Sequence, residues 1–508
     1  MSALEEMSRD ELIVLARAQQ GQITRLAEQV SRVAELEEQS AELAAVNTEL
    51  AERLARLERL ISRNSGNSGM PPSSDDQPGK PQPKDKRAGQ RTGGKRKPGK
   101  QPGAEGRQLA WRADPGEVVP HFPYGTCVCG DDLAEGRDLG VQAWHQVHDI
   151  PPVSAGVVQH DLHAVQCRCG KVHLAERPEG VASARVSFGV HLQALCVYLM
   201  VMHAIPVHRC CALVEALTGA APSPGFVHGM IARAAAAVAA ANARIRMLLT
   251  LAYVVNCDET PLRVGAAKVT KVKKYLLVAC TKLLTWYMLG DRSLETFKAS
   301  VLAELSGVMV HDRYQNYDSA ELGEHRHQLC ASHLLRDLED CVEEYPGAVW
   351  PVQIQRTLRG LIHAAGTARE QGEDAIEAGV KDELIRLFEH GVRVGLSEVP
   401  RIPGPAKTVT QPVGRVLLEV LRDREDDVLR FAHDLRVPPT NNQAERDVRP
   451  AKTQQKISGR LRSETATGDR YAIRGYLSTA AKHGADVISA IRDALLGRPW
   501  MPPDPATA

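Results

Sequence analysis

The sequence predicts a multidomain α+β protein, and three observations support that prediction. The chain has 508 residues, too many for one hydrophobic core, which indicates three or four domains. Apolar residues repeat with a helical period in some segments and form short, continuous, strand-like runs in others. Two closely spaced cysteine pairs lie in a turn-rich stretch that separates a helical N-terminal segment from the rest of the chain.

The first segment, residues 1–62, predicts a coiled coil that joins copies of the chain. Asn47 stands at an a position, where a lone Asn favours a parallel, two-stranded register. The alternative is an amphipathic helix packed on its own domain, but no second helix follows within reach. We therefore expect a homodimer or a higher oligomer. The leucines that fill the d positions at a spacing of seven are Leu36, Leu43, Leu50 and Leu57.

Charge is unevenly distributed, although 63 Lys and Arg nearly balance 62 Asp and Glu. Residues 1–62 hold twelve acidic and seven basic residues, whereas residues 77–112 hold eleven basic and two acidic ones. This basic stretch falls largely in a flexible linker at residues 63–109, and its charge suits a phosphate backbone. A solvated linker without a ligand is the alternative. The linker residues expected to bind DNA include Lys95, Arg96 and Lys97.

Composition argues against several classes of protein. There is no apolar run of about eighteen residues and the N-terminus is acidic, so we expect no membrane span and no secretory signal. Aromatic residues make up 4% of the chain, which argues against a stacking surface for single strands. In a cytoplasmic protein, the eleven cysteines are expected to be thiols or metal ligands.

Residues 110–180 predict a small zinc-binding module that resembles a zinc ribbon. Two Cys-Xaa-Cys-Gly units suit tetrahedral zinc, because two thiolate pairs supply four ligands and each Gly permits a tight turn. Each pair is one residue shorter than the usual Cys-x-x-Cys, so His121, His160 or His173 could replace one ligand. Four free cysteines are the alternative to a metal site. The expected ligands are Cys127, Cys129, Cys167 and Cys169.

Residues 181–250 have a helical pattern, with helices expected at Val190–His203 and Pro206–Leu217. After a Gly-containing turn, Ser223 and Pro224 are typical of a helix start, with Ser as the cap and Pro in the first position. A helix, a short turn and a second helix fit a helix-turn-helix that binds a DNA groove. A plain helical hairpin fits the pattern equally well.

Three acidic residues mark a candidate catalytic site. Asp258 ends one strand-like run, Asp312 follows another, and Glu445 lies near the start of a later helix. Carboxylates at the ends of adjacent strands face one cleft, where cations must offset their repulsion. Two Mg²⁺ ions sharing a carboxylate would stabilise the attacking and leaving oxygens of phosphoryl transfer. Considered singly, each acid has an ordinary alternative as a turn or surface residue.

Short blocks around these acids carry a family resemblance. They read CDET at Asp258, DRYQNY from Asp312 and NNQAER around Glu445, and they occur with SRNSGNSGMPPSSD, GKQPGAEG and RDVRP. Together they resemble DDE transposases of the bacterial insertion sequence sixty-six family. The resemblance implies a ribonuclease-H-like catalytic domain, which we place at residues 251–485, before a C-terminal helix and tail at 486–508. The long spacing before Glu445 indicates a helical insertion at about 345–435.

A further block of this family resemblance lies between the second and third acids. His327, Cys330, His333 and Arg336 are spaced by three, which predicts that they share one side of a helix. We interpret Cys330 and His333 as a structural hydrogen-bonded cluster, with metal binding as the alternative.

Four cations after Glu445 are expected to contact DNA. Lys452, seven residues after the acid, resembles a basic position of DDE enzymes near the scissile phosphate. Pro450 is expected to end or kink the helix, so we predict no continuous basic face. Surface solubility is the alternative role for each cation, and a salt bridge is a further one for Arg446. The four are Arg446, Arg449, Lys452 and Lys456.

The resemblance implies a polynucleotidyl transferase that uses Mg²⁺, with Mn²⁺ as a substitute. Water would hydrolyse a phosphodiester at each element end, and the freed 3′-hydroxyl would then attack target DNA. Accessory proteins of the same element are further expected partners, and the expected location is the bacterial cytoplasm, at the nucleoid. The alternatives are a DNA-binding regulator or architectural protein without catalysis, and a nuclease of the same fold that only hydrolyses.

Overall fold

A computed structural model of the chain describes residues 109–178, 180–265, 273–404 and 409–504, with Gln20, Gly21 and Arg32. The chain divides into two compact units, Met1–Val147 and His148–Ala508. Apart from the three isolated residues, the predicted coiled coil lies outside the described residues. So do Lys95, Arg96 and Lys97 of the basic linker.

The described part of the first unit is a turn-rich segment with one short helix, η2 (Leu133–Glu135). The rings of Trp111 and Trp144 lie 4.2 Å apart between centroids. At the first cysteine pair, the amide of Gly130 donates to the carbonyl of Cys127 at 2.9 Å, and Gly130 has a φ of 100°. That left-handed conformation requires glycine, which confirms the tight turn predicted there.

The second cysteine pair lies in the second unit and forms the same kind of turn. It connects the antiparallel strands β1 (Ala164–Gln166) and β2 (Val172–Leu174). The amide of Gly170 donates to the carbonyl of Cys167 at 2.8 Å, and Gly170 has a φ of 86°. Because the two pairs belong to different units, a shared zinc site stays a prediction.

A five-stranded mixed sheet organises the rest of the second unit, in the order β5-β4-β3-β6-β7. Strands β3, β4 and β5 pair antiparallel, whereas β6 runs parallel to β3 and β7 parallel to β6. The apolar run at residues 275–289 supplies two strands, β4 and β5, joined by a tight turn at Thr281. The bounds are β3 (Val254–Leu262), β4 (Lys274–Cys280), β5 (Thr285–Gly290), β6 (Val308–His311) and β7 (Arg326–Leu329).

Helices cover both faces of this sheet, which explains why its strands are apolar without simple alternation. On one face, Val255, Cys257 and Leu277 pack against α5 (Ala239–Thr250), α6 (Leu294–Ala299) and η3 (Val301–Glu304). On the other face, Leu276 and Val278 pack against α12 (Asn442–Ile457) and α13 (Glu464–Lys482).

The helices expected before the sheet are present, as α2 (Val190–Val201), α3 (Val207–Thr218) and α4 (Pro224–Ala237). The Ser223 hydroxyl accepts from the amide of Phe226, and Pro224 is in the first turn, as predicted. These helices share one core with α13 and α14 (Val487–Leu495). The helix-turn-helix function of this region stays a prediction.

Within the described residues, no single helix is long and apolar enough to cross a membrane. The bent pair α4 and α5 meets that test together, by length and composition only.

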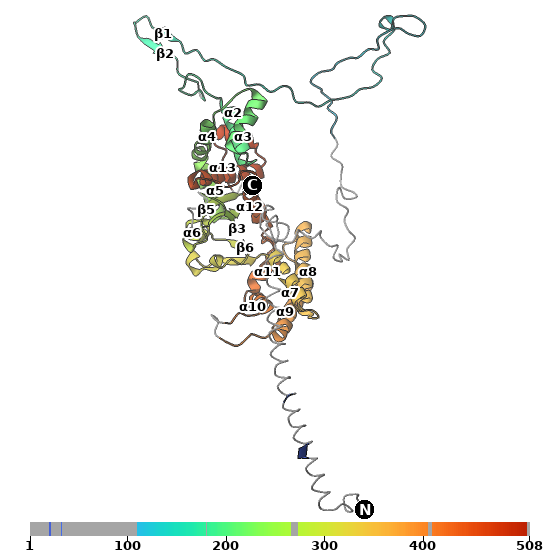
Figure 1. Ribbon diagram of the computed structural model, residues 1–508, viewed down its shortest axis with the longest axis vertical. Helices are drawn as coiled ribbons and strands as arrows, with labels where there is room; N and C mark the ends of the chain where they lie inside the picture. Colours follow the sequence, from blue (N-terminus) through green and yellow to red (C-terminus); the bar gives the residue numbers. More distant parts are fainter. Residues whose placement is uncertain are drawn as a thin grey trace, which may run out of the picture. The chain divides into compact units, whose positions relative to one another are not determined.

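A helical layer lies between β7 and α12 in the chain, where an insertion was expected. Its core is built on Trp350, Phe388 and Phe431, all fully buried. In Figure 1 the labelled strands β3, β5 and β6 lie between this layer and helices α2–α4. The layer consists of α7 (Ala331–Glu344), α8 (Trp350–Gln371), α9 (Ala378–Glu398), α10 (Val413–Asp423) and α11 (Glu425–His433).

Candidate active site

The sheet brings two of the three predicted acids to the same level. In the parallel pair β3 and β6, Asn256 is opposite Val310. Asp258, within β3, and Asp312, directly after β6, each follow these partners by two residues, so they lie at the same level of the sheet. The prediction that Asp258 ends its strand is wrong, because β3 continues to Leu262 through its pairing with β4. The pairing of β3 with β6 ends at Asn256, before Asp258, so Asp258 has no paired residue on the β6 side.

Electrostatics link Asp258 to the other two acids. Burial raises the pKa of Asp258 to about 7, and the carboxylates of Glu259, Asp312 and Glu445 add to the effect. A hydrogen bond of 2.8 Å from the Glu259 amide to Asp258 Oδ1 opposes it only in part. An uncompensated cluster of like charges is costly, and a bound cation would lower that cost.

Asn441 fastens the start of α12 to the centre of the sheet and so places Glu445. Its buried side chain donates to the carbonyl of Cys257 at 2.6 Å and accepts from the Asn256 amide group at 3.1 Å. One helical turn on, the amide of Glu445 donates to the carbonyl of Asn441 at 3.1 Å. Asn441 is at the N-cap position, but its side chain makes no capping bond, because it is committed to β3.

Glu445 also belongs to a group with Cys330 and His333. One ligand atom from each of the three lies within 4.8 Å of the others, and the described residues form no equivalent group from the three acids alone. Cys330 Sγ accepts a hydrogen bond from the backbone amide of Asn441 at 3.2 Å. A hydrogen bond with Cys330 raises the pKa of His333, although burial opposes it. Burial would raise the pKa of Cys330, but hydrogen bonds from His333 and Asn441 lower it.

The prediction that His327, Cys330, His333 and Arg336 share one side of a helix is wrong for the first two. His327 lies in β7, and Cys330 is the N-cap residue of α7. Only His333 and Arg336 are in the helix. Residues 326–329 form a strand instead, because β7 pairs with β6 through the register from Val308–Arg326 to His311–Leu329.

An ion pair between a buried acid and a half-buried arginine lies beside the catalytic candidates and was not predicted from the sequence. Glu259 is next to Asp258, but its side chain is 0% exposed and points to the opposite face, where it forms an ion pair with Arg292. Tyr317 donates to the same carboxylate at 2.6 Å. The Arg292 guanidinium lies over the ring of Tyr314 at 4.2 Å. The sequence signal for this ion pair is the spacing of the two tyrosines after Asp312, because Tyr314 contacts Arg292 and Tyr317 contacts Glu259.

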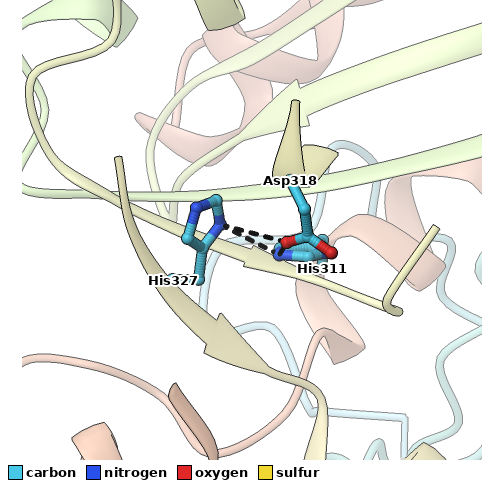
Figure 2. A group of neighbouring side chains, drawn as sticks. All are labelled: His311, Asp318 and His327. Carbon is cyan, nitrogen blue, oxygen red and sulfur yellow. Dashed lines mark hydrogen bonds and ion pairs between the residues drawn. The ribbon is translucent and has the colours of Figure 1, made fainter. Parts of the chain in front are cut away.

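His311, directly before Asp312, belongs to a second group with Asp318 and His327 (Figure 2). His311 Nε2 lies 3.1 Å from His327 Nδ1 and 3.8 Å from Asp318 Oδ1. The Arg313 amide donates to His311 Nδ1 at 3.2 Å, so the proton of the neutral ring is on Nε2 and is donated to His327. Burial lowers the pKa of both imidazoles, which favours this neutral pair.

This second group is satisfied without a metal ion. A histidine that binds a metal through one nitrogen normally donates from the other, and His311 Nδ1 accepts instead. The guanidinium of Arg424 binds Asp318 Oδ2 at 2.8 Å and supplies the positive charge that the carboxylate needs. The group therefore fixes the end of β6, and Asp312 is the next residue in the chain.

The four cations predicted to bind DNA are all exposed on α12. Pro450 was predicted to end or kink this helix; it does not end it, because α12 continues through Pro450 to Ile457. Val448 and Ala451, on either side of Pro450, are buried against the sheet. This packing offsets the loss of one hydrogen bond, and Arg449, Lys452 and Lys456 therefore follow Glu445 on one continuous helix.

Residues 185–468 match the family model described as the Transposase IS66 family, which covers more than half of the chain, including all three acids and the helical layer. The protein is thus a transposase, a DNA-processing enzyme. The chain belongs to the IS66 family. Residues 16–110 match a second model, described as a family of unknown function, DUF6444. No curated protein matches the chain.

Proposed function

We propose that this transposase is a DDE enzyme that cleaves the ends of its insertion sequence and joins them to target DNA. The observation that carries the proposal is that Asp258 on β3 and Asp312 directly after β6 each lie two residues beyond the last residues that these strands pair, with the pKa of Asp258 raised to about 7. The order β5-β4-β3-β6-β7, antiparallel and then parallel, supports the ribonuclease-H-like core that the family resemblance implies.

The donor set fits Mg²⁺, with Mn²⁺ as a substitute, because both prefer carboxylate oxygens. Asp258, Asp312 and Glu445 would hold two ions. Bound there, the ions would neutralise charge on the attacking and leaving oxygens of the scissile phosphate. Glu445 has to turn from Cys330 and His333 toward the two aspartates, a movement that the side chain permits because it is only partly buried.

The remaining parts of the chain supply DNA binding. Arg446, Arg449, Lys452 and Lys456 present positive charge next to Glu445, where they would hold the phosphate backbone beside the scissile bond. Lys95, Arg96 and Lys97 of the basic linker would extend this contact. Water attacks first at each element end, and the 3′-hydroxyl that is freed then attacks target DNA in the same site.

Other features of the proposal concern assembly. The cysteine pairs would bind one structural Zn²⁺, and the coiled coil would join two or more copies of the chain. Accessory proteins of the same element are further candidate partners. An enzyme that acts on chromosomal DNA in a bacterium is expected in the cytoplasm, at the nucleoid.

The test is Mg²⁺-dependent cleavage of DNA that carries the element's own ends. We expect Asp312→Asn and Glu445→Gln each to lower the rate by more than about 100-fold, since even groups behind a metal ligand contribute about 10–100-fold. Asp426→Asn, a matched change at an exposed acid of α11, should keep the wild-type rate. Full cleavage by Asp312→Asn would refute the assignment.

The same assay separates the alternative functions. A regulator or architectural protein would bind end DNA without nicking it, and Glu445→Gln would change nothing. A nuclease that only hydrolyses would cut the ends but fail to join DNA supplied with pre-cleaved 3′-hydroxyl ends. A transposase gives joined products from that substrate.

A further inference from the structure

We propose that Cys330, His333 and Glu445 form a second metal site, selective for soft divalent ions such as Zn²⁺, which inhibits the enzyme by holding Glu445 away from the two aspartates. The binding part of this proposal stands on the geometry alone. The inhibitory part rests on the catalytic role proposed above for Glu445.

The donor set determines the class of ion. A thiolate, an imidazole and a carboxylate are ligands that Zn²⁺ accepts together, whereas Mg²⁺ prefers oxygen and keeps its water. The three ligand atoms lie within 4.8 Å of one another. Zinc bonds of about 2.0–2.3 Å in a tetrahedron place ligand atoms about 3.3–3.8 Å apart. The group therefore has to close by at most about 1–1.5 Å, and the partly buried His333 and Glu445 can make that movement.

The surroundings of the group suit a bound metal. The Asn441 amide donates to Cys330 Sγ at 3.2 Å, a bond that supports a thiolate ligand. Asn441 is itself fixed by the carbonyl of Cys257, so this donor is held in place. His333 Nδ1 is buried and has no hydrogen-bond partner within the described part of the chain, so this nitrogen is not committed to a protein group.

The group around His311, Asp318 and His327 differs from this one in how its ligand atoms are bonded. There, an amide donates to His311 Nδ1, which opposes metal binding through Nε2, and Arg424 already neutralises Asp318. At Cys330 the backbone amide of Asn441 donates to the ligand sulfur itself. In this group, unlike the one around His311, a ring nitrogen, His333 Nδ1, is buried without a hydrogen-bond partner in the described part of the chain.

Cobalt binding tests the site directly, because Co²⁺ bonded to a thiolate gives a sulfur-to-metal charge-transfer band in the near ultraviolet. The full-length chain carries Ser at Cys127, Cys129, Cys167 and Cys169, so that the cysteine pairs contribute no band. We expect this protein to bind one Co²⁺ with the band. Cys330→Ser should abolish the band, and His333→Gln should weaken binding by at least about tenfold.

Cys211→Ser is the matched control, because Cys211 is a half-buried cysteine of α3 away from this group. It should leave both the band and the affinity unchanged. The absence of a band at saturating Co²⁺, or a band that persists in Cys330→Ser, would overturn the proposal. Circular dichroism melts report folding. If Cys330→Ser does not fold, His333→Gln and Glu445→Gln decide the outcome, and unchanged affinity in both would overturn it.

Zinc inhibition tests the second part. Added Zn²⁺ should inhibit Mg²⁺-dependent cleavage, and His333→Gln should need at least about tenfold more Zn²⁺ for the same fractional inhibition of its own rate. Equal zinc sensitivity in both proteins would refute the link to Glu445. If Co²⁺ binds as expected but no protein cleaves end DNA, the proposed function fails and the metal site stands.

Discussion

At the residue scale, Asn441 carries an unusual share of the site, because its side chain and backbone bind β3, Cys330 and the first turn of α12. We predict that Asn441→Ala lowers the free energy of unfolding by about 2–4 kcal/mol, since it leaves the Cys257 carbonyl and the Asn256 amide buried without partners. Urea denaturation measures the change. Asn442→Ala, at the exposed neighbour, should stay within about 0.5 kcal/mol of wild type. Equal effects would contradict this role.

Asp434, at the end of α11, gives a residue-scale prediction about pH. Hydrogen bonds from Arg436, at 3.0 Å, and from Tyr253 lower its pKa to about 2, below the ordinary value for an unfolded chain. A lowered folded pKa means that the carboxylate stabilises the fold above about pH 4 and that this contribution is lost as the pH falls toward 2. We expect Asp434→Asn to cost about 1–2 kcal/mol at pH 7, after allowance for solvent screening.

Thermal unfolding of wild type and Asp434→Asn between pH 7 and pH 3 checks this prediction. The difference between the two proteins should shrink as the pH falls below about 4. A constant difference over the whole range would show that the charge of Asp434 is not its cause.

At the element scale, the sequence predicted the elements whose signals are local. Ser223 and Pro224 mark the start of α4, and the glycines after each cysteine pair mark turns, because caps and left-handed turns depend on adjacent residues. The errors concern Asp258, His327 and Pro450, where pairing with β4, pairing with β6 and packing on the sheet decide the outcome. Such contacts join residues far apart in the chain, so no local pattern reports them.

Packing between elements is tested by two glycines of the helical layer. A Cβ at Gly395 of α9 would lie 2.6 Å from Leu418 and 2.9 Å from Trp350, whereas one at Gly366 of α8 would meet nothing within 4 Å. We predict that Gly395→Ala destabilises the protein by about 1–3 kcal/mol through overpacking. Gly366→Ala should stabilise it by about 0.5–1 kcal/mol through helix propensity. Chemical denaturation measures both, and the same sign for the two would contradict the packing described here.

At the scale of the whole molecule, the sequence indicates which acids belong to the candidate site, but it does not indicate which residues hold them in place. Asp258, Asp312 and Glu445 stand in short blocks that can be read directly. The residues that hold the site together cannot be read from the sequence in this way. Arg292 binds Glu259 from 33 residues away, and Asn441 binds Cys257 from 184 residues away. The blocks therefore indicate which chemistry to expect, while the pairing of the strands determines which side chains lie together.

Assembly is the remaining question at this scale, and it depends on residues 1–62, outside the described part of the chain. Leu43 and Leu50 occupy d positions of the heptads, so a charge there should disrupt a buried seam, whereas Ala45 at an f position should face solvent. We predict that the full-length chain of 55.4 kDa sediments as a dimer or higher oligomer in analytical ultracentrifugation at tens of micromolar. Leu43→Glu with Leu50→Glu should give monomers, and Ala45→Glu should not. A monomeric wild type would refute the coiled coil. An oligomer that survives both leucine changes would show that another surface joins the copies.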